Sequence, residues 1–141
     1  MEGYPAVVEL EVRYRDLDPL GHVNNAVYLS YIELARVRYF ELLGLAEGAM
    51  GTGPAPVVAR AEIDYLRPVF LGQRVRVGAR IERVGRTSFA MAYLVAALGK
   101  PAARARTVHV MVAGQEKVPL GQELRARIAA LERLPVEGLG G

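Results

Sequence analysis

The chain of 141 residues contains no cysteine and only two histidines, His22 and His109. Without cysteine it can form no disulfide, no thiolate metal ligand and no cysteine nucleophile. Two histidines are too few for most histidine-rich metal sites. Any chemistry therefore has to come from carboxylates, amides, hydroxyls, backbone groups and at most two imidazoles.

The sequence also lacks long apolar runs and is poor in lysine. No segment reaches the roughly 20 apolar residues that span a bilayer. The first five residues have neither a basic start nor an apolar signal region, so we expect a cytoplasmic protein. Its hydrophobic content of 52% is enough for one domain with a real core.

Of the 18 cationic residues only Lys100 and Lys117 are lysines, so the net charge of +3 rests on arginine. Arginine binds phosphate through two parallel hydrogen bonds, which suits a phosphate-bearing small molecule. High-GC codon bias or thermophilic adaptation explains the same composition equally well. No run of basic residues alternates with aromatic ones, so we expect no nucleic-acid partner.

What the chain does have is a loop crowded with reactive groups. Two carboxylates (Asp16, Asp18), one imidazole (His22) and two carboxamides (Asn24, Asn25) fall within ten residues. A strand-like segment precedes this loop and an apolar helix follows it. Exposed N–H groups at the start of a helix favour developing negative charge. A carboxylate facing such a site is typical of acyl-transfer or hydrolytic chemistry.

Hydrophobic periodicity predicts the elements around the loop. Alternation over residues 6–15 predicts a half-buried strand, which Pro19 and Gly21 end. A helix is expected to begin at a cap formed by Asn24 or Asn25 and to end near residue 43. This helix is apolar nearly all round, which is typical of a helix that a curved sheet wraps.

The second half of the chain predicts an antiparallel sheet. Four strand segments are separated by hairpin-length turns, over residues 56–67, 73–84, 87–98 and 102–113. Residues 46–55 are expected to form a connector or the edge of a site, and a last helix is expected to begin at Pro119. We expect one domain over residues 1–134 and a flexible tail over residues 135–141.

This order of elements, with Asp-x-Asp-x-x-Gly-His-x-Asn-Asn between the first strand and the helix, resembles the hotdog-fold acyl-CoA thioesterases. The 4-hydroxybenzoyl-CoA thioesterase group is the most similar branch. The resemblance is carried by residues 14–18, 21–25, Tyr28 and residues 31–36, with a weaker match over residues 84–89. It implies an α+β hotdog fold: a curved antiparallel five-stranded sheet wrapped around a long central helix, with a second helix at the C-terminus.

The resemblance also implies roles. Asp18, directly before Pro19, matches the catalytic aspartate, acting as nucleophile or as general base on water. The backbone N–H of Asn25 matches the group that polarises the thioester carbonyl. His22 and Asn24 are similar to residues of the plant acyl-carrier-protein thioesterases. The family implies an acyl-CoA substrate, no metal or other cofactor, and a homodimer or homotetramer.

Plainer interpretations stand beside these roles. Asp18 can simply accept hydrogen bonds within its turn, and Asn24 and Asn25 can act only as helix caps. Arg83 and Arg86, in the predicted hairpin, either hold the phosphates of coenzyme A or lie in an ordinary solvated turn.

Three more residues have plain interpretations. Asp16 is expected to fix the loop, Glu33 to pair with a nearby arginine, and His109 to lie in the core or at an interface. Three other functions remain open: an acyl-carrier-protein thioesterase, a hydratase or dehydratase using His22 and Glu33, and a binder of acyl thioesters without activity.

Overall fold

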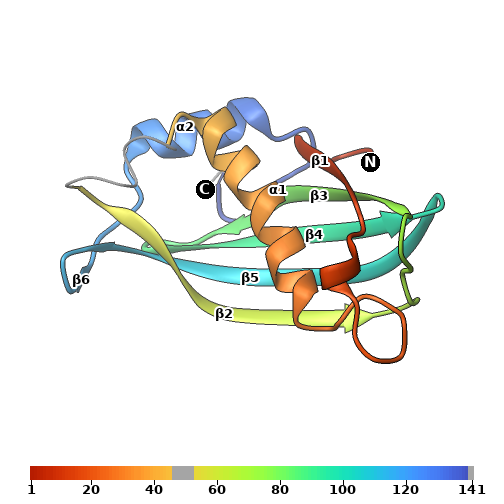
Figure 1. Ribbon diagram of the computed structural model, residues 1–141. Helices are drawn as coiled ribbons and strands as arrows, with labels where there is room; N and C mark the ends of the chain where they lie inside the picture. Colours follow the sequence, from red (N-terminus) through yellow and green to blue (C-terminus); the bar gives the residue numbers. More distant parts are fainter. Residues whose placement is uncertain (46–52, 140–141) are drawn as a thin grey trace.

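The computed structural model describes residues 1–45 and 53–139, so most of the connector expected over residues 46–55 lies outside the described residues. Six strands and two α-helices follow one another along the chain (Figure 1). They are β1 (Ala6–Glu11), α1 (Val27–Leu43), β2 (Ala55–Tyr65), β3 (Arg74–Val84), β4 (Ser88–Ala97), β5 (Lys100–Ala113), β6 (Glu116–Lys117) and α2 (Gln122–Leu131).

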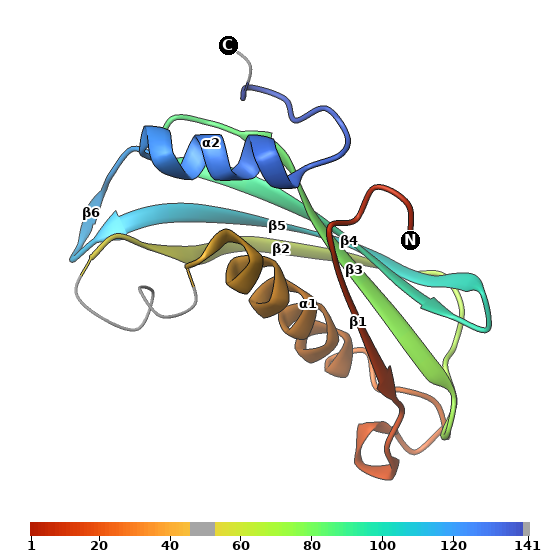
Figure 2. The same cartoon turned by 90° about the horizontal axis from the view of Figure 1, so that it is seen from above.

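The strands form one antiparallel sheet in the order β1-β3-β4-β5-β2, with the short β6 paired to β5. Figures 1 and 2 show this sheet curving past α1, which crosses one of its faces. Helix α2 packs at the end of the sheet where β3 turns into β4, and Arg125 Nη2 donates to the Gly85 carbonyl there at 2.7 Å. The α+β hotdog fold with five main strands is therefore confirmed.

Burial of α1 is more one-sided than its composition suggests. Its buried residues recur every three or four positions and pack on the apolar face of the sheet: Tyr28, Tyr31, Ile32, Ala35, Tyr39 and Leu43. Four other apolar residues of the helix are 40–52% exposed: Leu29, Leu34, Val37 and Leu42. In the single chain the sheet therefore covers one face of α1 and leaves the opposite face uncovered.

The first strand is shorter than its alternating pattern predicts. Pairing with β3 ends at Glu11, and residues Tyr14–Asp16 form a 3₁₀ turn that leaves the Tyr14 side chain 82% exposed. The turn forms because the Asp16 carboxylate accepts the Arg13 N–H at 2.9 Å, a local bond that competes with strand pairing.

The start of α1 also differs slightly from expectation. The helix begins at Val27, and the Asn24 side chain accepts the Ala26 N–H at 2.9 Å while its carbonyl accepts the Val27 N–H. Asn24 therefore closes the turn that leads into the helix.

The described end of the chain is attached to the sheet. Strand β1 pairs with β3 only as far as Ala79, and beyond it the backbone of Glu137 bonds to Glu82 and Val84 at 3.0 and 2.8 Å. The domain boundary at residue 134 and the flexible tail stay predictions, and residues 140–141 lie outside the described residues. Within the described ranges, no helix has the length and apolar character needed to cross a membrane.

Candidate active site

The loop between β1 and α1 is closed on itself and fastened to the segment before β3. Within the loop, the Asp18 N–H donates to the His22 carbonyl at 2.9 Å and the Gly21 N–H donates to the Asp18 carbonyl at 3.0 Å. Gly21 has φ +87°, a conformation that a side chain would strain. The Val23 N–H donates to the Val69 carbonyl at 2.8 Å. These bonds hold the polar side chains in a defined arrangement.

Asp18 and His22 contact each other in this loop. One carboxylate oxygen of Asp18 accepts the Leu20 N–H at 2.9 Å, and the other lies 3.2 Å from His22 Nδ1. A proton on Nδ1 can be shared between this carboxylate and the Val23 carbonyl, which lies at 3.4 Å. That arrangement directs the second ring nitrogen, Nε2, away from the loop backbone. Asp18 thus accepts a turn hydrogen bond and also orients an imidazole.

The neighbouring carboxylate, Asp16, forms hydrogen bonds that stabilise the loop and its contact with α1. Its side chain is buried and accepts the Tyr31 hydroxyl at 2.9 Å as well as the Arg13 N–H. Its backbone carbonyl accepts the Asn24 N–H at 2.9 Å. Burial and the bond to Asp16 raise the pKa of Tyr31, so the hydroxyl stays protonated as the donor.

The start of α1 offers an unused donor next to the loop. Within the described residues, the Asn25 N–H has no hydrogen-bond acceptor, whereas the next two N–H groups are bonded to Asn24. The Asn25 carbonyl accepts the Tyr65 hydroxyl at 3.0 Å, and the Tyr65 ring packs edge-on against Tyr28 at 5.2 Å. Tyrosine contacts from β2 thus hold the backbone of Asn25 in place. A free N–H at a helix start can stabilise an oxyanion.

These groups line a pocket of about 240 Å³ between the loop and the end of β2. Its walls include His22, Asn25, Tyr28, Tyr65, Arg67 and Pro68. Tyr65 and Arg67 were missed by the sequence reasoning, which treated them as the end of an ordinary strand. Their signal was the segment Tyr65-Leu66-Arg67-Pro68, where an aromatic and a cationic residue directly precede a strand-ending proline.

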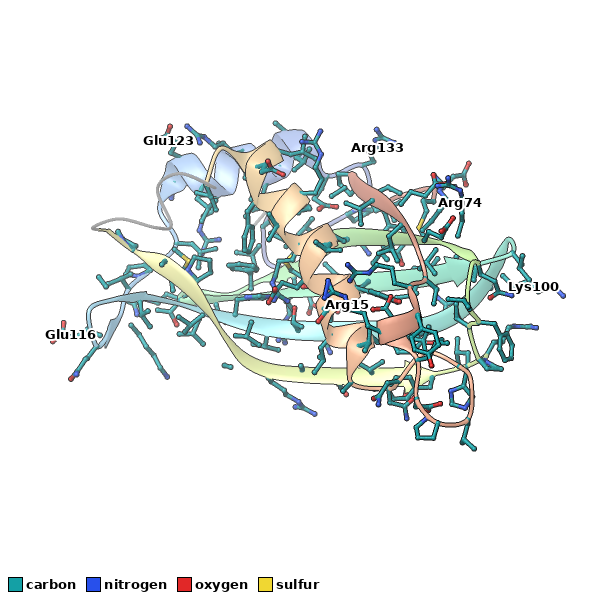
Figure 3. All side chains as sticks on the ribbon, viewed as in Figure 1. Arg15, Arg74, Lys100, Glu116, Glu123 and Arg133 are labelled. Carbon is teal, nitrogen blue, oxygen red and sulfur yellow. The ribbon has the colours of Figure 1, made fainter. Side chains whose placement is uncertain are left out.

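Arg83 and Arg86 lie far from this pocket in the same chain. Glu11, which leads into the loop, pairs with Arg74 at the start of β3. Arg83 is nine residues further along that strand, which corresponds to about 30 Å at 3.3 Å per residue. Figure 3 shows the two ends: Arg74 and Lys100 lie at the end with the loop, and Glu116 and Glu123 at the other. One chain alone does not bring these two arginines to the site.

Two other titratable residues lie apart from the pocket. Glu33 is exposed on α1 and its carboxylate lies 3.5 Å from the Arg36 guanidinium, as expected. It lines a different pocket from His22, next to Asp16 and Tyr31.

His109 is buried in the core. Its ring stacks on Phe89 at 4.9 Å, and Nε2 is bonded to the Thr107 hydroxyl at 2.8 Å. Burial, together with the Arg36 charge, lowers the pKa of His109 to about 4. The interpretation of His109 as a core residue is confirmed.

Comparison with known proteins identifies the family of this chain. The family model of the thioesterase-like superfamily matches residues 12–128. A thioesterase from Thermus thermophilus, whose crystal structure contains coenzyme A and zinc, is 51% identical with a TM-score of 0.87, covering 96% of this chain and 100% of that one.

Two relatives found by sequence similarity are also named as thioester hydrolases. A 1,4-dihydroxy-2-naphthoyl-CoA hydrolase from Synechococcus elongatus is 30% identical over 81% of this chain and 88% of its own length. An acyl-acyl carrier protein thioesterase from Arabidopsis thaliana is 36% identical over 52% of this chain, but over only 40% of its own length. The chain therefore belongs to the thioesterase-like superfamily, that is, to the thioester hydrolases of the hotdog fold.

Proposed function

We propose that this protein hydrolyses an acyl-CoA thioester to a carboxylic acid and free coenzyme A at the pocket beside Asn25. The observation that supports this most directly is the unused N–H of Asn25 in a pocket that His22, the partner of Asp18, also lines. Hydrolysis needs a donor for the carbonyl oxygen and an oxygen nucleophile, and these residues are suited to supply both. The relatives are named as hydrolases of CoA thioesters and of carrier-protein thioesters, which supports the same substrate class.

In this proposal the thioester carbonyl accepts the Asn25 N–H, which stabilises the tetrahedral oxyanion. Asp18 then acts in one of two ways. As nucleophile it forms a mixed anhydride with the acyl group, expels the thiolate, and is regenerated by water. As general base it takes a proton from the attacking water, and the proton passes to the leaving thiolate. His22, in contact with Asp18, assists either route by holding the carboxylate or relaying the proton.

A single turnover in heavy-oxygen water tests the nucleophilic route. If Asp18 is the nucleophile and water attacks the anhydride at the Asp18 carboxyl carbon, heavy oxygen stays in the Asp18 peptide, which mass spectrometry detects. If Asp18 is a base, or if water attacks the anhydride at the acyl carbon, the label appears in the released acid, so an unlabelled Asp18 peptide is followed by trapping of the anhydride with hydroxylamine, which only the nucleophilic route allows.

The direct test of the proposed function is thiol release from a panel of aromatic and aliphatic acyl thioesters, measured with the wild-type protein. We expect turnover on at least one acyl-CoA. Conversion of enoyl or 3-hydroxyacyl thioesters without thiol release would instead assign a hydratase or dehydratase. Binding without turnover across the whole panel would assign a non-catalytic binder. The separate pockets of His22 and Glu33 favour hydrolysis over the first of these alternatives.

We also propose that two chains pair through β2. This strand lies at the edge of the sheet, and its side chains Val57 and Val58 are 46% and 48% exposed. A long exposed edge strand is a template for pairing with another chain. The uncovered apolar row of α1 adds to the surface that a partner would bury.

Such pairing would explain the position of the hairpin arginines. In an antiparallel β2–β2 pair, the start of the second chain's β2 lies beside the end of the first chain's β2, at Tyr65. The hairpin end of the second chain then lies on the same side as the first chain's loop. Arg83 and Arg86 of the second chain would serve the first chain's pocket, and the site would be incomplete in a monomer. Light scattering should give a dimer or tetramer at micromolar concentration, and a monomer would contradict this arrangement.

A further inference from the structure

A second pocket continues the candidate active site along the surface. The pocket beside Asn25 and a neighbouring pocket of about 280 Å³ share Arg67 and Pro68 in their walls. The second pocket is completed by Phe70, Gln73, Leu98 and Lys100, among others. Together the two pockets form a groove that begins at the reactive loop and ends at the turn between β4 and β5.

The backbone holds both sides of this groove in place. The N–H groups of Leu66 and Arg67 both donate to the Ala102 carbonyl, at 2.9 and 3.2 Å, which fixes the end of β2 beside the start of β5. On the other side, the Gln73 side chain accepts the Phe70 N–H at 3.1 Å. Figure 3 shows Lys100, the first residue of β5, at the end of the sheet where β4 turns into β5.

Among the described residues, the two cations of the groove have no carboxylate partner close by. Within the described residues, neither Arg67 nor Lys100 has a carboxylate within 4.0 Å, whereas six other arginines in the sheet and helices have one: Arg36, Arg60, Arg74, Arg80, Arg106 and Arg127. Two uncompensated positive charges on one groove favour an anion.

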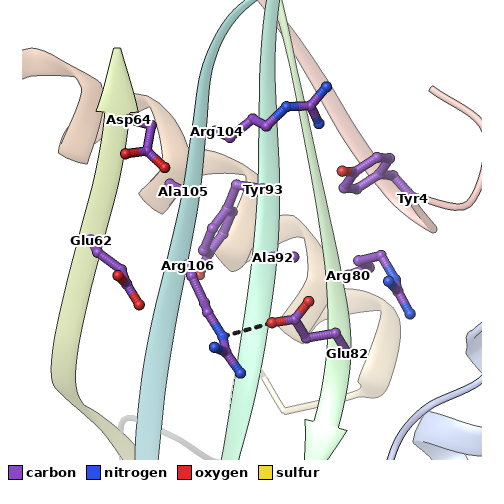
Figure 4. Close-up of a pocket in the computed structure, with 10 residues that line it drawn as sticks. All are labelled: Tyr4, Glu62, Asp64, Arg80, Glu82, Ala92, Tyr93, Arg104, Ala105 and Arg106. Carbon is purple, nitrogen blue, oxygen red and sulfur yellow. Dashed lines mark ion pairs between the residues drawn. The ribbon is translucent and has the colours of Figure 1, made fainter. Parts of the chain in front are cut away.

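A larger pocket on the sheet makes a useful contrast. In Figure 4 three arginines there are interspersed with three carboxylates, and Arg106 Nε lies 2.7 Å from Glu82. Equal numbers of opposite charges leave that pocket without a preference for anions. The groove with Arg67 and Lys100 is therefore the better candidate for a phosphate.

The spacing fits a substrate whose reactive end and anionic group are far apart. Tyr65, which holds the Asn25 backbone, is paired with Ala103, and Lys100 lies three residues earlier on β5. At 3.3 Å per residue this places the Lys100 backbone about 10 Å further along the sheet. Both cations have long side chains, so a phosphate can be held towards the Lys100 end of the groove, away from the thioester carbon.

Given the proposed function, we infer that this groove binds the 4′-phosphopantetheine arm of the thioester, with its phosphate between Arg67 and Lys100. The apolar walls of Pro68, Phe70 and Leu98 contact the methyl and methylene groups of the arm. Coenzyme A and acyl carrier protein present this same arm. The inference therefore concerns the part of the substrate that both carriers share.

The test compares acyl-pantetheine, acyl-4′-phosphopantetheine and acyl-CoA with one acyl group. In the double variant Arg67→Gln/Lys100→Gln we expect KM to rise about tenfold or more for the two phosphorylated substrates, with kcat nearly unchanged. KM for acyl-pantetheine should change least, because it has no phosphate, and the single variant Lys100→Gln, which lies outside the pocket of Asn25, should leave it unchanged. Arg104→Gln together with Lys117→Gln removes the same charge elsewhere on the sheet and should leave all three substrates unaffected.

Two results would overturn the inference: an equal rise in KM for acyl-pantetheine, or no rise for acyl-4′-phosphopantetheine. A loss confined to acyl-CoA would also overturn it, since the cations would then bind the nucleotide. Equal losses with acyl-CoA and with an acyl group on carrier protein would support the shared arm, and the wild-type kcat/KM values would identify the preferred carrier.

Failure of the proposed hydrolysis is distinguishable from failure of this inference. Turnover of acyl-pantetheine by the wild-type protein tests hydrolysis without any phosphate contact. If no thioester is hydrolysed, calorimetric titration with 4′-phosphopantetheine and with pantetheine still tests the groove. Tighter binding of the phosphorylated compound, lost in the double variant, would support it, and equal binding of the two would contradict it.

Discussion

The two histidines occupy opposite environments, and the contrast separates the site from the core. The His22 side chain is 31% exposed, lies 3.2 Å from a carboxylate and lines a pocket. His109 is 1% exposed, is bonded to a hydroxyl and stacks on a phenyl ring. A partly exposed imidazole beside a carboxylate can exchange protons with a substrate, whereas a buried one of lowered pKa is held neutral.

Asp18 and Asp16 show the same contrast two residues apart. Asp16 uses its carboxylate in bonds to Tyr31 and Arg13 inside the protein. Asp18 has one oxygen bonded to its own turn and the other beside His22. Of the two carboxylates, Asp18 makes fewer contacts with the rest of the fold, which is why the proposal assigns the chemistry to it.

The largest effect is expected from Asp18→Asn. The amide can neither attack a carbonyl nor accept a proton from water, so thioester turnover should fall at least about a hundredfold. The amide oxygen can still accept the Leu20 N–H, so the thermal midpoint and the oligomeric state should be retained. Steady-state thiol release and thermal unfolding on the same preparation check both points. Near-normal turnover in a folded variant would remove Asp18 from the mechanism.

Asp16→Asn should reverse the pattern, with a loss of stability that exceeds its effect on chemistry. The substitution weakens a buried acceptor of the Tyr31 hydroxyl and the Arg13 N–H, which typically costs about 1–3 kcal/mol in unfolding free energy. Urea denaturation measures that cost. Tyr31→Phe is the matched variant, because it removes the donor and leaves the carboxylate. If Asp16→Asn reduces kcat more than Asp18→Asn does, the two carboxylates have been assigned the wrong way round.

The buried histidine predicts a dependence of stability on pH. The pKa of His109 is about 4 in the folded chain, below the ordinary value of 6.5, so the unfolded chain binds the proton more readily between these values. Stability should therefore fall as the pH is lowered from about 6.5 towards 4, by about 2 kcal/mol between pH 7 and pH 5. His109→Gln should remove this part of the dependence in urea titrations. An unchanged dependence in His109→Gln would contradict the assignment.

The sequence was sufficient to predict the order of the helices and strands and the reactive loop, because both depend on patterns among residues close together in the chain. Alternation marked the strands of the sheet, and the spacing from Asp16 to Asn25 placed the polar groups before a helix. The early end of β1 was missed because it depends on a bond between Asp16 and the Arg13 backbone. Which residues of α1 the sheet leaves uncovered was not predicted, because composition does not reveal the orientation of the helix.

The contacts of the site that join segments far apart in the sequence could not be predicted. The bond from the Tyr65 hydroxyl to the Asn25 carbonyl joins residues 40 positions apart, and no periodic pattern announces it. The same holds for the groove between Arg67 and Lys100, which exists only because the end of β2 lies beside the start of β5. Conversely, Arg83 and Arg86 were predicted from a local hairpin signal, and in the proposed dimer their contact with the pocket depends on a second chain.

The smallest effect is expected from Arg86→Ala, which tests whether Arg86 contacts a substrate bound at the pocket of a second chain. Arg86 is exposed, and its backbone carbonyl accepts the Leu120 N–H at 2.9 Å whatever the side chain, so the fold should not change. If the second chain's Arg86 binds the nucleotide phosphates of acyl-CoA, KM for acyl-CoA should rise a few-fold with kcat nearly constant, because a solvated phosphate contact contributes mainly to binding. Acyl-4′-phosphopantetheine, which lacks the nucleotide, should be insensitive. This outcome would distinguish the hairpin from the Arg67–Lys100 groove, since the groove variant should affect both substrates. An equal loss with both substrates would give Arg86 a structural role, and no change with either would leave it in a solvated turn.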